Sequence, residues 1–231
     1  MLALHEVYSS YATMQVLFGV TLEVRPGESV CLLGRNGMGK TTIFRAITGN
    51  VAVKSGKIEF NAKDISSKSI FERARLGMRY IPDIRGVFDN LTVLENLQLA
   101  KLRTNRNADI SEVIDLFPEF KYRLNQRAGT LSGGERKLLS ISMSIISKPK
   151  LAILDELSEG VAPLVLERIS SALVELKKKG AMILLAEQNV QFGCKSADRV
   201  YIVRKGKVVY ESNVEKFLQS NAIDEHIGLS T

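Results

Sequence analysis

The sequence contains the glycine-rich stretch Gly34-Arg35-Asn36-Gly37-Met38-Gly39-Lys40-Thr41, followed by Thr42. It matches the pattern G-x-x-x-x-G-K-[ST] and stands between an apolar run, Val30–Leu33, and a helix-like run. Glycines let backbone N–H groups converge on a phosphate, and the start of a helix adds partial positive charge. We therefore expect residues 34–42 to bind nucleotide phosphates, with Lys40 on the β- and γ-phosphates and Thr41 on Mg²⁺. A chance match on a glycine-rich turn is the alternative, and the strand–loop–helix context argues against it.

Strand-like and helix-like segments alternate on both sides of this loop. The expected strands are Leu2–Val7, Gln15–Val24, Ser29–Leu33, Lys57–Phe60, Met78–Ile81, Leu151–Leu154, Ala181–Leu185, Arg199–Arg204 and Lys207–Glu211. The expected helices are Lys40–Thr48, Thr92–Lys101, Ile110–Phe117, Gly133–Ser147, Pro163–Lys179 and the tail Val214–Ile227. This order predicts an α/β fold with a mostly parallel sheet, helices on both faces and an antiparallel β portion. We expect one domain, 1–231, in which a helical subdomain, 84–149, is inserted into a core of 1–83 and 150–231.

The composition is that of an ordinary globular chain of 231 residues with a net charge of +7. This net charge has three possible interpretations: a basic surface without a special target, a surface that faces an anionic membrane, or one that binds nucleic acid. Nucleic acid is disfavoured, because no basic stripe with interleaved aromatic residues is visible. Cys31 and Cys194 are typical of reduced, buried thiols in a cytosolic protein. We see neither a signal peptide nor a membrane-spanning run, so a membrane role would be peripheral.

A second acidic feature closes the strand Leu151–Leu154, where Asp155 and Glu156 follow directly. The carboxyl ends of parallel strands border the crevice in which open α/β sheets bind ligands. We expect Asp155 to hold Mg²⁺, usually through water, and Glu156 to orient and deprotonate an attacking water. Two solvated acids at the start of a loop are the alternative.

A second candidate phosphate grip is Leu131-Ser132-Gly133-Gly134-Glu135, which precedes a long helix. Taken alone, it indicates a helix capped by Ser132. A nucleotide needs only one such loop from the chain that binds it, however. The second loop therefore suggests a contact with a nucleotide that another chain binds. We therefore expect a head-to-tail pair of chains with two shared nucleotides, closed by two-fold symmetry.

These motifs and their order resemble the ABC family of ATP-driven transporters over essentially the whole chain. The run 131–135 resembles the ABC signature, and it lies after the phosphate loop and about twenty residues before Asp155, as in that family. The resemblance implies ATP and Mg²⁺ as cofactors and contact of Ser132 and Gly134 with the partner's γ-phosphate. It also implies that Tyr11 stacks on adenine, with a core tyrosine as the alternative.

Two single residues and one loop depart from the common ABC pattern. Asp83 stands where glutamine is usual, and Gln188 replaces the switch histidine. In the loop after Glu156, Leu157 replaces proline and Ala162 replaces aspartate. The pattern resembles the shorter of the two ATPase subunits of branched-chain amino-acid importers, whose close relatives handle urea or short amides. Gln188 can hydrogen-bond a γ-phosphate without titrating near neutral pH, and Asp83 can hold Mg²⁺ or water. Weakened hydrolysis is the alternative for these two positions.

The resemblance implies a peripheral ATPase at the cytoplasmic face of the cell membrane. Its implied partners are a second ATPase subunit (identical or paralogous), integral-membrane permease subunits and, indirectly, an extracytoplasmic solute-binding protein. The segment 84–91 borders the groove that receives a permease helix in relatives, where Val87 and Phe88 would suit the contact; a small satellite core is the alternative. A non-transport ABC scaffold and an idle ATP-binding partner are the rival functions.

Overall fold

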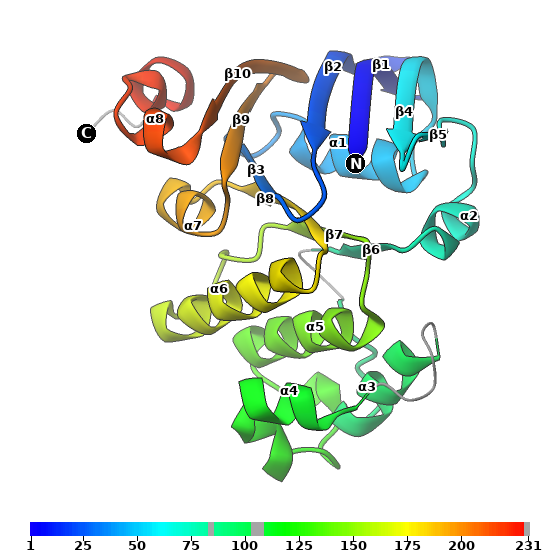
Figure 1. Ribbon diagram of the computed structural model, residues 1–231, viewed down its shortest axis with the longest axis vertical. Coiled ribbons are helices and arrows are strands. Elements are labelled where there is room, and N and C mark those ends of the chain that lie inside the picture. Colours follow the sequence, from blue (N-terminus) through cyan, green and yellow to red (C-terminus); the bar gives the residue numbers. More distant parts are fainter. Residues whose placement is uncertain (83–85, 103–108, 229–231) are drawn as a thin grey trace.

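The computed structural model describes residues 1–82, 86–102 and 109–228, and its strands form two sheets (Figure 1). A four-stranded antiparallel sheet has the order β2-β1-β4-β5, and a six-stranded sheet has the order β10-β9-β3-β8-β7-β6. The strands are β1 (Leu2–Tyr11), β2 (Met14–Val24), β3 (Ser29–Leu33), β4 (Val53–Phe60), β5 (Lys63–Asp64), β6 (Met78–Ile81), β7 (Leu151–Asp155), β8 (Met182–Glu187), β9 (Arg199–Arg204) and β10 (Lys207–Asn213). Within the larger sheet all pairings are parallel except that of β9 with β10. The expected fold class is confirmed.

The helices lie in two groups. The α-helices are α1 (Lys40–Thr48), α2 (Ile70–Arg75), α3 (Val93–Lys101), α4 (Ser111–Leu116), α5 (Gly133–Ser147), α6 (Pro163–Lys178), α7 (Val190–Lys195) and α8 (Val214–Leu218). Two 3-10 helices, η1 (Pro118–Tyr122) and η2 (Ala128–Thr130), and a π-helical turn, η3 (Ile223–Ile227), complete them. Figure 1 shows α1 beside the small sheet and α3, α4 and α5 at the opposite end of the molecule, with α6 between them and the large sheet.

The large sheet is buried on both faces, which explains its continuous apolar strands. In β3, Val30 and Leu32 pack with α1 and the small sheet, whereas Cys31 and Leu33 pack with the helices of the other face. In β7, Ile153 likewise packs on the side of α1 and the small sheet, and Leu154 packs on the other face. Successive side chains of a strand point to opposite faces, so one short run serves two cores.

Strand register fixes where the candidate site residues meet. Leu33 at the end of β3 pairs with Glu187 at the end of β8, and Asp155 at the end of β7 pairs with Ala186. These three parallel strands therefore end together at one edge of the sheet. This is the edge at which open α/β sheets bind ligands.

Several element bounds agree with the sequence expectations, and some differ. Ser29–Leu33, Lys40–Thr48 and Gly133–Ser147 are as expected. The tail is not one helix, because α8 ends at Leu218 and the chain turns before η3. The short helices α2 and α7 were not expected, because six residues are too few to show a helical period. The elements described between β6 and β7 are helical, and the division into a core and a subdomain stays a prediction.

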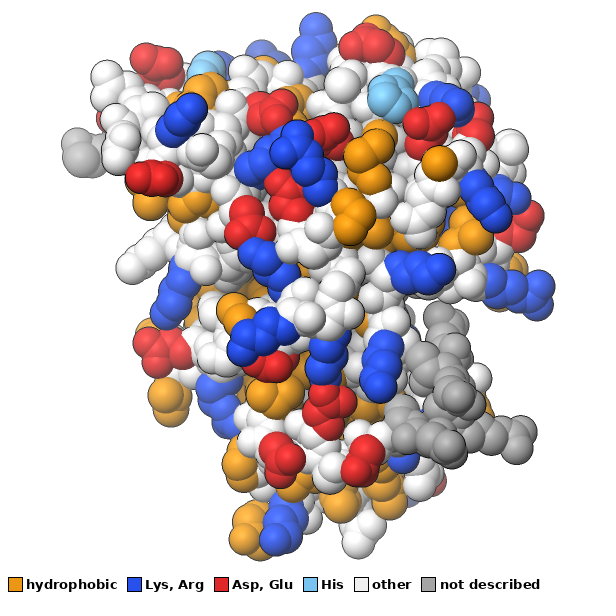
Figure 2. Space-filling view, in the orientation of Figure 1, with side chains coloured by type: hydrophobic (Ala, Val, Ile, Leu, Met, Phe, Trp, Pro, Cys, Tyr) orange, Lys and Arg blue, Asp and Glu red, His pale blue; other side chains and the backbone are white. Residues whose placement is uncertain are grey.

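On the face drawn in Figure 2, basic and acidic side chains are interspersed rather than gathered into one stripe. Across the described residues, no helix combines the length and the apolar character needed to cross a membrane.

The short helix α2 anchors the end of α1 through Arg73. This side chain is only 2% exposed, and its guanidinium donates to the carbonyls of Ala46 (2.6 Å), Ile47 (2.7 Å), Lys68 and Ser66. The last carbonyls of a helix have no partner within it, and a cation there also complements the helix dipole. Arg73 thus fixes the end of the helix whose beginning carries the phosphate loop.

The substitution Arg73→Met keeps the apolar stem but removes the donors from buried carbonyls. We expect the free energy of unfolding to fall by about 2–4 kcal/mol, measured by urea denaturation. The matched control is Arg75→Met, an exposed residue of the same helix, which should change stability by less than about 0.5 kcal/mol. Equal effects of the two substitutions would show that Arg73 is no anchor.

Candidate nucleotide-binding site

The phosphate loop leaves the first turn of α1 without a side-chain cap. Gly39, at the N-cap, has φ of +105° and provides no side-chain acceptor for the N–H groups that follow it. Gly37 has φ of +78° with open space where a Cβ would stand. Both positions require glycine for their backbone angle. The uncapped N–H groups, together with the open space at Gly37, make residues 34–42 a suitable cradle for phosphate.

Lys40 lies inside this loop and faces Glu156. Its side chain is 3% exposed, and Nζ donates to the carbonyls of Gly34 (2.6 Å) and Arg35 (3.1 Å). The same Nζ lies 3.1 Å from Glu156 Oε1. A buried ammonium must be paired, and here a carboxylate and two carbonyls pair it. The structure thus brings together the expected phosphate-binding lysine and the expected general base.

Asp155 is buried at the end of β7 with one oxygen unsatisfied. Tyr80 donates from Oη to Asp155 Oδ2 at 3.0 Å, whereas Oδ1 has no hydrogen-bond partner among the described residues. Burial raises the pKa of Asp155, and the hydroxyls of Thr41 and Tyr80 oppose the rise. An orphaned carboxylate oxygen near a threonine hydroxyl is the oxygen-rich donor set that Mg²⁺ prefers, so these residues fit that ion.

Glu156 occupies a backbone conformation that few side-chain-bearing residues adopt, with φ of +46°. Two contacts hold it: its N–H donates to the carbonyl of Ala186 at 2.9 Å, and Lys137 of α5 donates to its carbonyl at 2.9 Å. Gln188 follows β8 directly and is exposed. Asp83, the third residue expected to act in catalysis, lies outside the described residues.

The signature run 131–135 starts α5 with a reciprocal cap. Ser132 Oγ accepts from the N–H of Glu135, and the Glu135 carboxylate accepts from the N–H of Ser132 at 2.8 Å. A Cβ at Gly133 would meet nothing within 4 Å. Figure 1 places α5 in the lower half of the molecule, away from α1, so the two helix starts do not meet within one chain.

Tyr11 ends β1 at the tip of a hairpin and is 36% exposed. Arg45 of α1 donates to its hydroxyl at 3.1 Å, which holds the ring on the side of the phosphate-loop helix. The core alternative is therefore wrong for Tyr11, and stacking on adenine stays a prediction.

Sequence reasoning missed three contacts around the site. Tyr80 reaches Asp155 because β6 lies next to β7, Lys137 reaches the loop after Glu156, and Arg35 donates to the carbonyls of Ile227 and Gly228 in the tail. Each contact joins segments far apart in the chain. For the contact of Tyr80 with Asp155, the expected strand Met78–Ile81 was the only local signal in the sequence.

The two unusual residues of the loop after Glu156 have local structural roles. Leu157 is buried in the core formed with the helices. Ala162 is the N-cap of α6, and this cap has no side-chain hydrogen bond. A leucine in the place of proline therefore adds apolar burial, and an alanine leaves the helix start without its usual acceptor.

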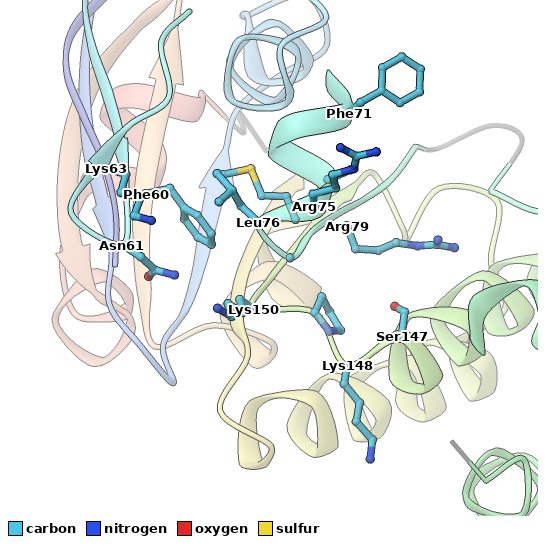
Figure 3. Close-up of a pocket in the computed structure, with 14 residues that line it drawn as sticks. Phe60, Asn61, Lys63, Phe71, Arg75, Leu76, Arg79, Ser147, Lys148 and Lys150 are labelled. Atoms are coloured by element: carbon cyan, nitrogen blue, oxygen red, sulfur yellow. The ribbon is translucent and has the colours of Figure 1, made fainter. Parts of the chain in front are cut away.

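A pocket of about 630 Å³ lies away from this site, at the other ends of the parallel strands (Figure 3). Gly77 and Lys150 precede β6 and β7, and the pocket also includes the exposed ring of Phe71 and the basic residues Arg75 and Lys148. The parallel strands separate it from the edge that carries the phosphate loop, so it is not the nucleotide site.

A phosphate loop after β3, an acidic pair at the end of β7, the next strand but one, and a glycine-rich capped helix define an ATP-binding cassette. Residues 17–159 match the ABC transporter family model, and this chain belongs to that family of ATPases.

The chain is similar to curated members of the family over nearly its full length. It is 35% identical to the high-affinity branched-chain amino acid transport ATP-binding protein BraG of Pseudomonas aeruginosa, covering 99% of this chain and 100% of BraG. It is 31% identical to the probable branched-chain amino acid transport ATP-binding protein LivF of Archaeoglobus fulgidus, covering 97% of each. It is also 33% identical to the lipopolysaccharide export system ATP-binding protein LptB of Haemophilus influenzae, covering 93% of this chain and 91% of LptB.

Solved structures agree on the fold. A nucleotide-free ATP-binding cassette from an ABC transporter superposes with a TM-score of 0.84 at 24% identity, covering 97% of both chains.

The substitution Asp155→Asn tests whether the buried carboxylate costs stability when no ligand is present. The pKa of Asp155 is higher in the folded chain than in the unfolded chain. The stability that Asp155 contributes is therefore fully present below its unfolded pKa, and it is lost as the pH rises through its folded pKa. At pH 8, without nucleotide or metal, we expect the variant to be more stable by about 1 kcal/mol in urea denaturation, and this gain should shrink in acid.

Asp198→Asn is the contrasting control. Asp198 accepts from the N–H of Ser29 at 2.9 Å and pairs with Lys177 at 2.5 Å, so its loss should lower stability at pH 8. A fall for both substitutions would contradict the assignment of Asp155 as an unsatisfied ligand group.

Proposed function

We propose that this chain is the ATP-hydrolysing subunit of an importer for branched-chain or other hydrophobic amino acids. The observation that carries the ATPase chemistry is the convergence of Lys40 Nζ and Glu156 Oε1, 3.1 Å apart, at the edge where β3 and β7 end. The substrate class rests on the similarity to BraG and LivF over almost the whole chain. The Gln188 position and the loop 157–163 support the same branch.

Each group at the strand ends has a defined part in the proposed hydrolysis. Residues 34–42 bind the phosphates, and Lys40 exchanges its contact with Glu156 for the β- and γ-phosphates. Glu156, released from this pairing, accepts a proton from the attacking water. Asp155 and Thr41 would hold Mg²⁺, which would supply positive charge against the phosphate oxygens. Gln188, beyond β8, donates its amide to the γ-phosphate.

The signature helix completes the site of a second chain. The hydroxyl of Ser132 accepts in its own cap, so its O–H remains available as a donor to a phosphate. Open space at Gly133 allows a close approach. A solved bacterial ABC transporter cassette with a TM-score of 0.83 is described as dimeric, and pairing of this chain with an identical or paralogous subunit extends that arrangement.

Permease subunits are the remaining partners, and they would hold the chain at the cytoplasmic face of the membrane. Phe88, 57% exposed, is the better contact in the segment 84–91, because Val87 is buried in the helical core. The similarity to LptB shows that a related subunit serves export, so the direction and the solute need a direct test.

Transport measures this function directly. The chain is purified with its permease subunits, placed in vesicles with the solute-binding protein, and supplied with labelled leucine, urea or a short amide. ATP-dependent uptake of leucine supports the proposal. Uptake of urea or the amide alone would assign the related importer branch, and ATP turnover without uptake of any solute would contradict an importer.

The substitution Glu156→Gln should retain ATP binding and lower hydrolysis about 10²–10⁴-fold, because it removes the proton acceptor and keeps the shape. Phosphate release measures the rate of ATP hydrolysis, and binding of a fluorescent ATP analogue measures the affinity for nucleotide. Glu215→Gln, an exposed glutamate of α8, is the control and should hydrolyse normally. Unchanged turnover in Glu156→Gln would remove the role given to this residue.

The substitution Ser132→Arg should block pairing without affecting ATP binding by the single chain, because an arginine would fill the space for the partner's phosphate. In a Glu156→Gln background with Mg-ATP, size-exclusion chromatography should show pairs that the added Ser132→Arg abolishes. Ser69→Arg removes the same kind of reciprocal cap from α2 and should leave pairing intact. Equal losses from both would mean that the cap, not the phosphate contact, was tested.

A further inference from the structure

The strand β8 ends in a buried carboxylate that the proposed hydrolysis does not use. Glu187 is 1% exposed, and its carboxylate accepts from the Ser158 hydroxyl at 2.5 Å and from the Ser158 N–H at 3.2 Å. The N–H of Leu157 is a further donor to it. Every one of these donors belongs to the two residues that follow Glu156.

This contact bears on the most constrained backbone position of the site. A left-handed backbone conformation costs about 1–3 kcal/mol in a residue other than glycine, and it persists only where the surrounding structure enforces it. Glu156 is such a residue, with φ of +46°. Lys137 holds the loop from the α5 side by donating to the carbonyls of Glu156 and Glu159. Glu187 holds it from the sheet side.

The backbone of Glu187 meets the phosphate loop as well. Its carbonyl accepts from the N–H of Gly34 at 3.3 Å, and it pairs in register with Leu33. One residue therefore touches the first glycine of the phosphate loop through its main chain and the loop after Glu156 through its side chain. Gln188 is the next residue along the chain.

We propose that Glu187 is a positioning residue, whose side chain fixes the loop 157–158 and thereby sets Glu156 against the phosphate loop. This inference rests on the proposed role of Glu156. The side chain at this position must be buried, must have about the volume of glutamate, and must accept hydrogen bonds from the donors of the loop 157–158.

The surroundings of Glu187 fit this requirement. A Cβ on Gly193 of α7 would lie 3.6 Å from Glu187 Cβ and 2.9 Å from Cys31 Sγ, so α7 packs closely against the base of the Glu187 side chain. Burial raises the pKa of Glu187 to about 7, against the hydrogen bonds from Ser158 and Leu157. The charged or titratable groups that interact electrostatically with Glu187 are Glu156 and Cys31.

The test compares variants of the full-length chain by steady-state ATP hydrolysis and by binding of a fluorescent ATP analogue. Glu187→Leu keeps the volume without an acceptor, Ser158→Ala removes the hydroxyl donor, and Glu187→Gln keeps one acceptor oxygen. We expect kcat to fall about 10–30-fold in Glu187→Leu and less in Ser158→Ala, with KM and ATP affinity within about 2-fold of the parent. Glu187→Gln should remain within about 3-fold of the parent.

Two further comparisons separate positioning from general damage. The combination of Glu187→Leu with Ser158→Ala should be no worse than Glu187→Leu alone, because both remove one interaction. In a Glu156→Gln background, Glu187→Leu should have little further effect on the residual rate. Ser170→Ala, a buried serine of α6 whose hydroxyl lies 3.4 Å from that of Ser196, is the control and should keep full activity.

Folding is checked by thermal unfolding, and Ser158→Ala and Glu187→Gln carry the test if Glu187→Leu does not fold. The inference is overturned by normal turnover in both Glu187→Leu and Ser158→Ala, by multiplying effects in the double variant, or by a loss that lies in KM. Failure of Glu156→Gln to lower turnover would instead overturn the proposed function itself.

Discussion

The parallel pairing of β3, β8 and β7 is the constraint on which the rest of the site depends. Their register makes Leu33, Glu187 and Asp155 end at one edge of the sheet. The phosphate loop, the switch position and the acidic pair leave the strands at these points. A shift of one residue in any strand would turn its apolar side chains to the other face and destroy one of two cores. The packing of the sheet thus fixes the geometry of the chemistry.

The buried charges at this edge differ in how far the protein itself satisfies them. Lys40 is satisfied by Glu156 and two loop carbonyls. Asp155, by contrast, retains an oxygen that no described residue satisfies. Phosphate would compete with Glu156 for the lysine, and a cation would satisfy Asp155. A phosphate that bound the lysine would thus release the proposed base from its contact with Lys40.

Sequence reasoning succeeded where a short local pattern determines the structure. The glycine-rich loop with Lys40 and the acidic pair after a buried strand are such patterns, because their place in the fold follows from the residue types and the adjoining elements, whereas their roles stay predictions. The contacts of Tyr80, Lys137 and Arg35 could not be predicted, since each depends on which distant segments the fold places side by side. The same reason hides Glu187, which in sequence is one more polar residue after an apolar strand. Its partner, Ser158, lies 29 residues away.

The two glycine-rich helix starts differ in a way that suits their different tasks. At α1 the N-cap is Gly39, which has no side chain to accept from the first N–H groups, so these donors are open to a phosphate. At α5 Ser132 and Glu135 already satisfy two of the donors, so this helix start is complete in the single chain. A phosphate therefore gains more from α1 than from α5. In the proposed pairing, the first helix start would hold the nucleotide of its own chain, and the second would add a weaker contact to the partner's nucleotide. Loss of that second contact would leave no unsatisfied helix start behind, because the cap of α5 lies within one chain.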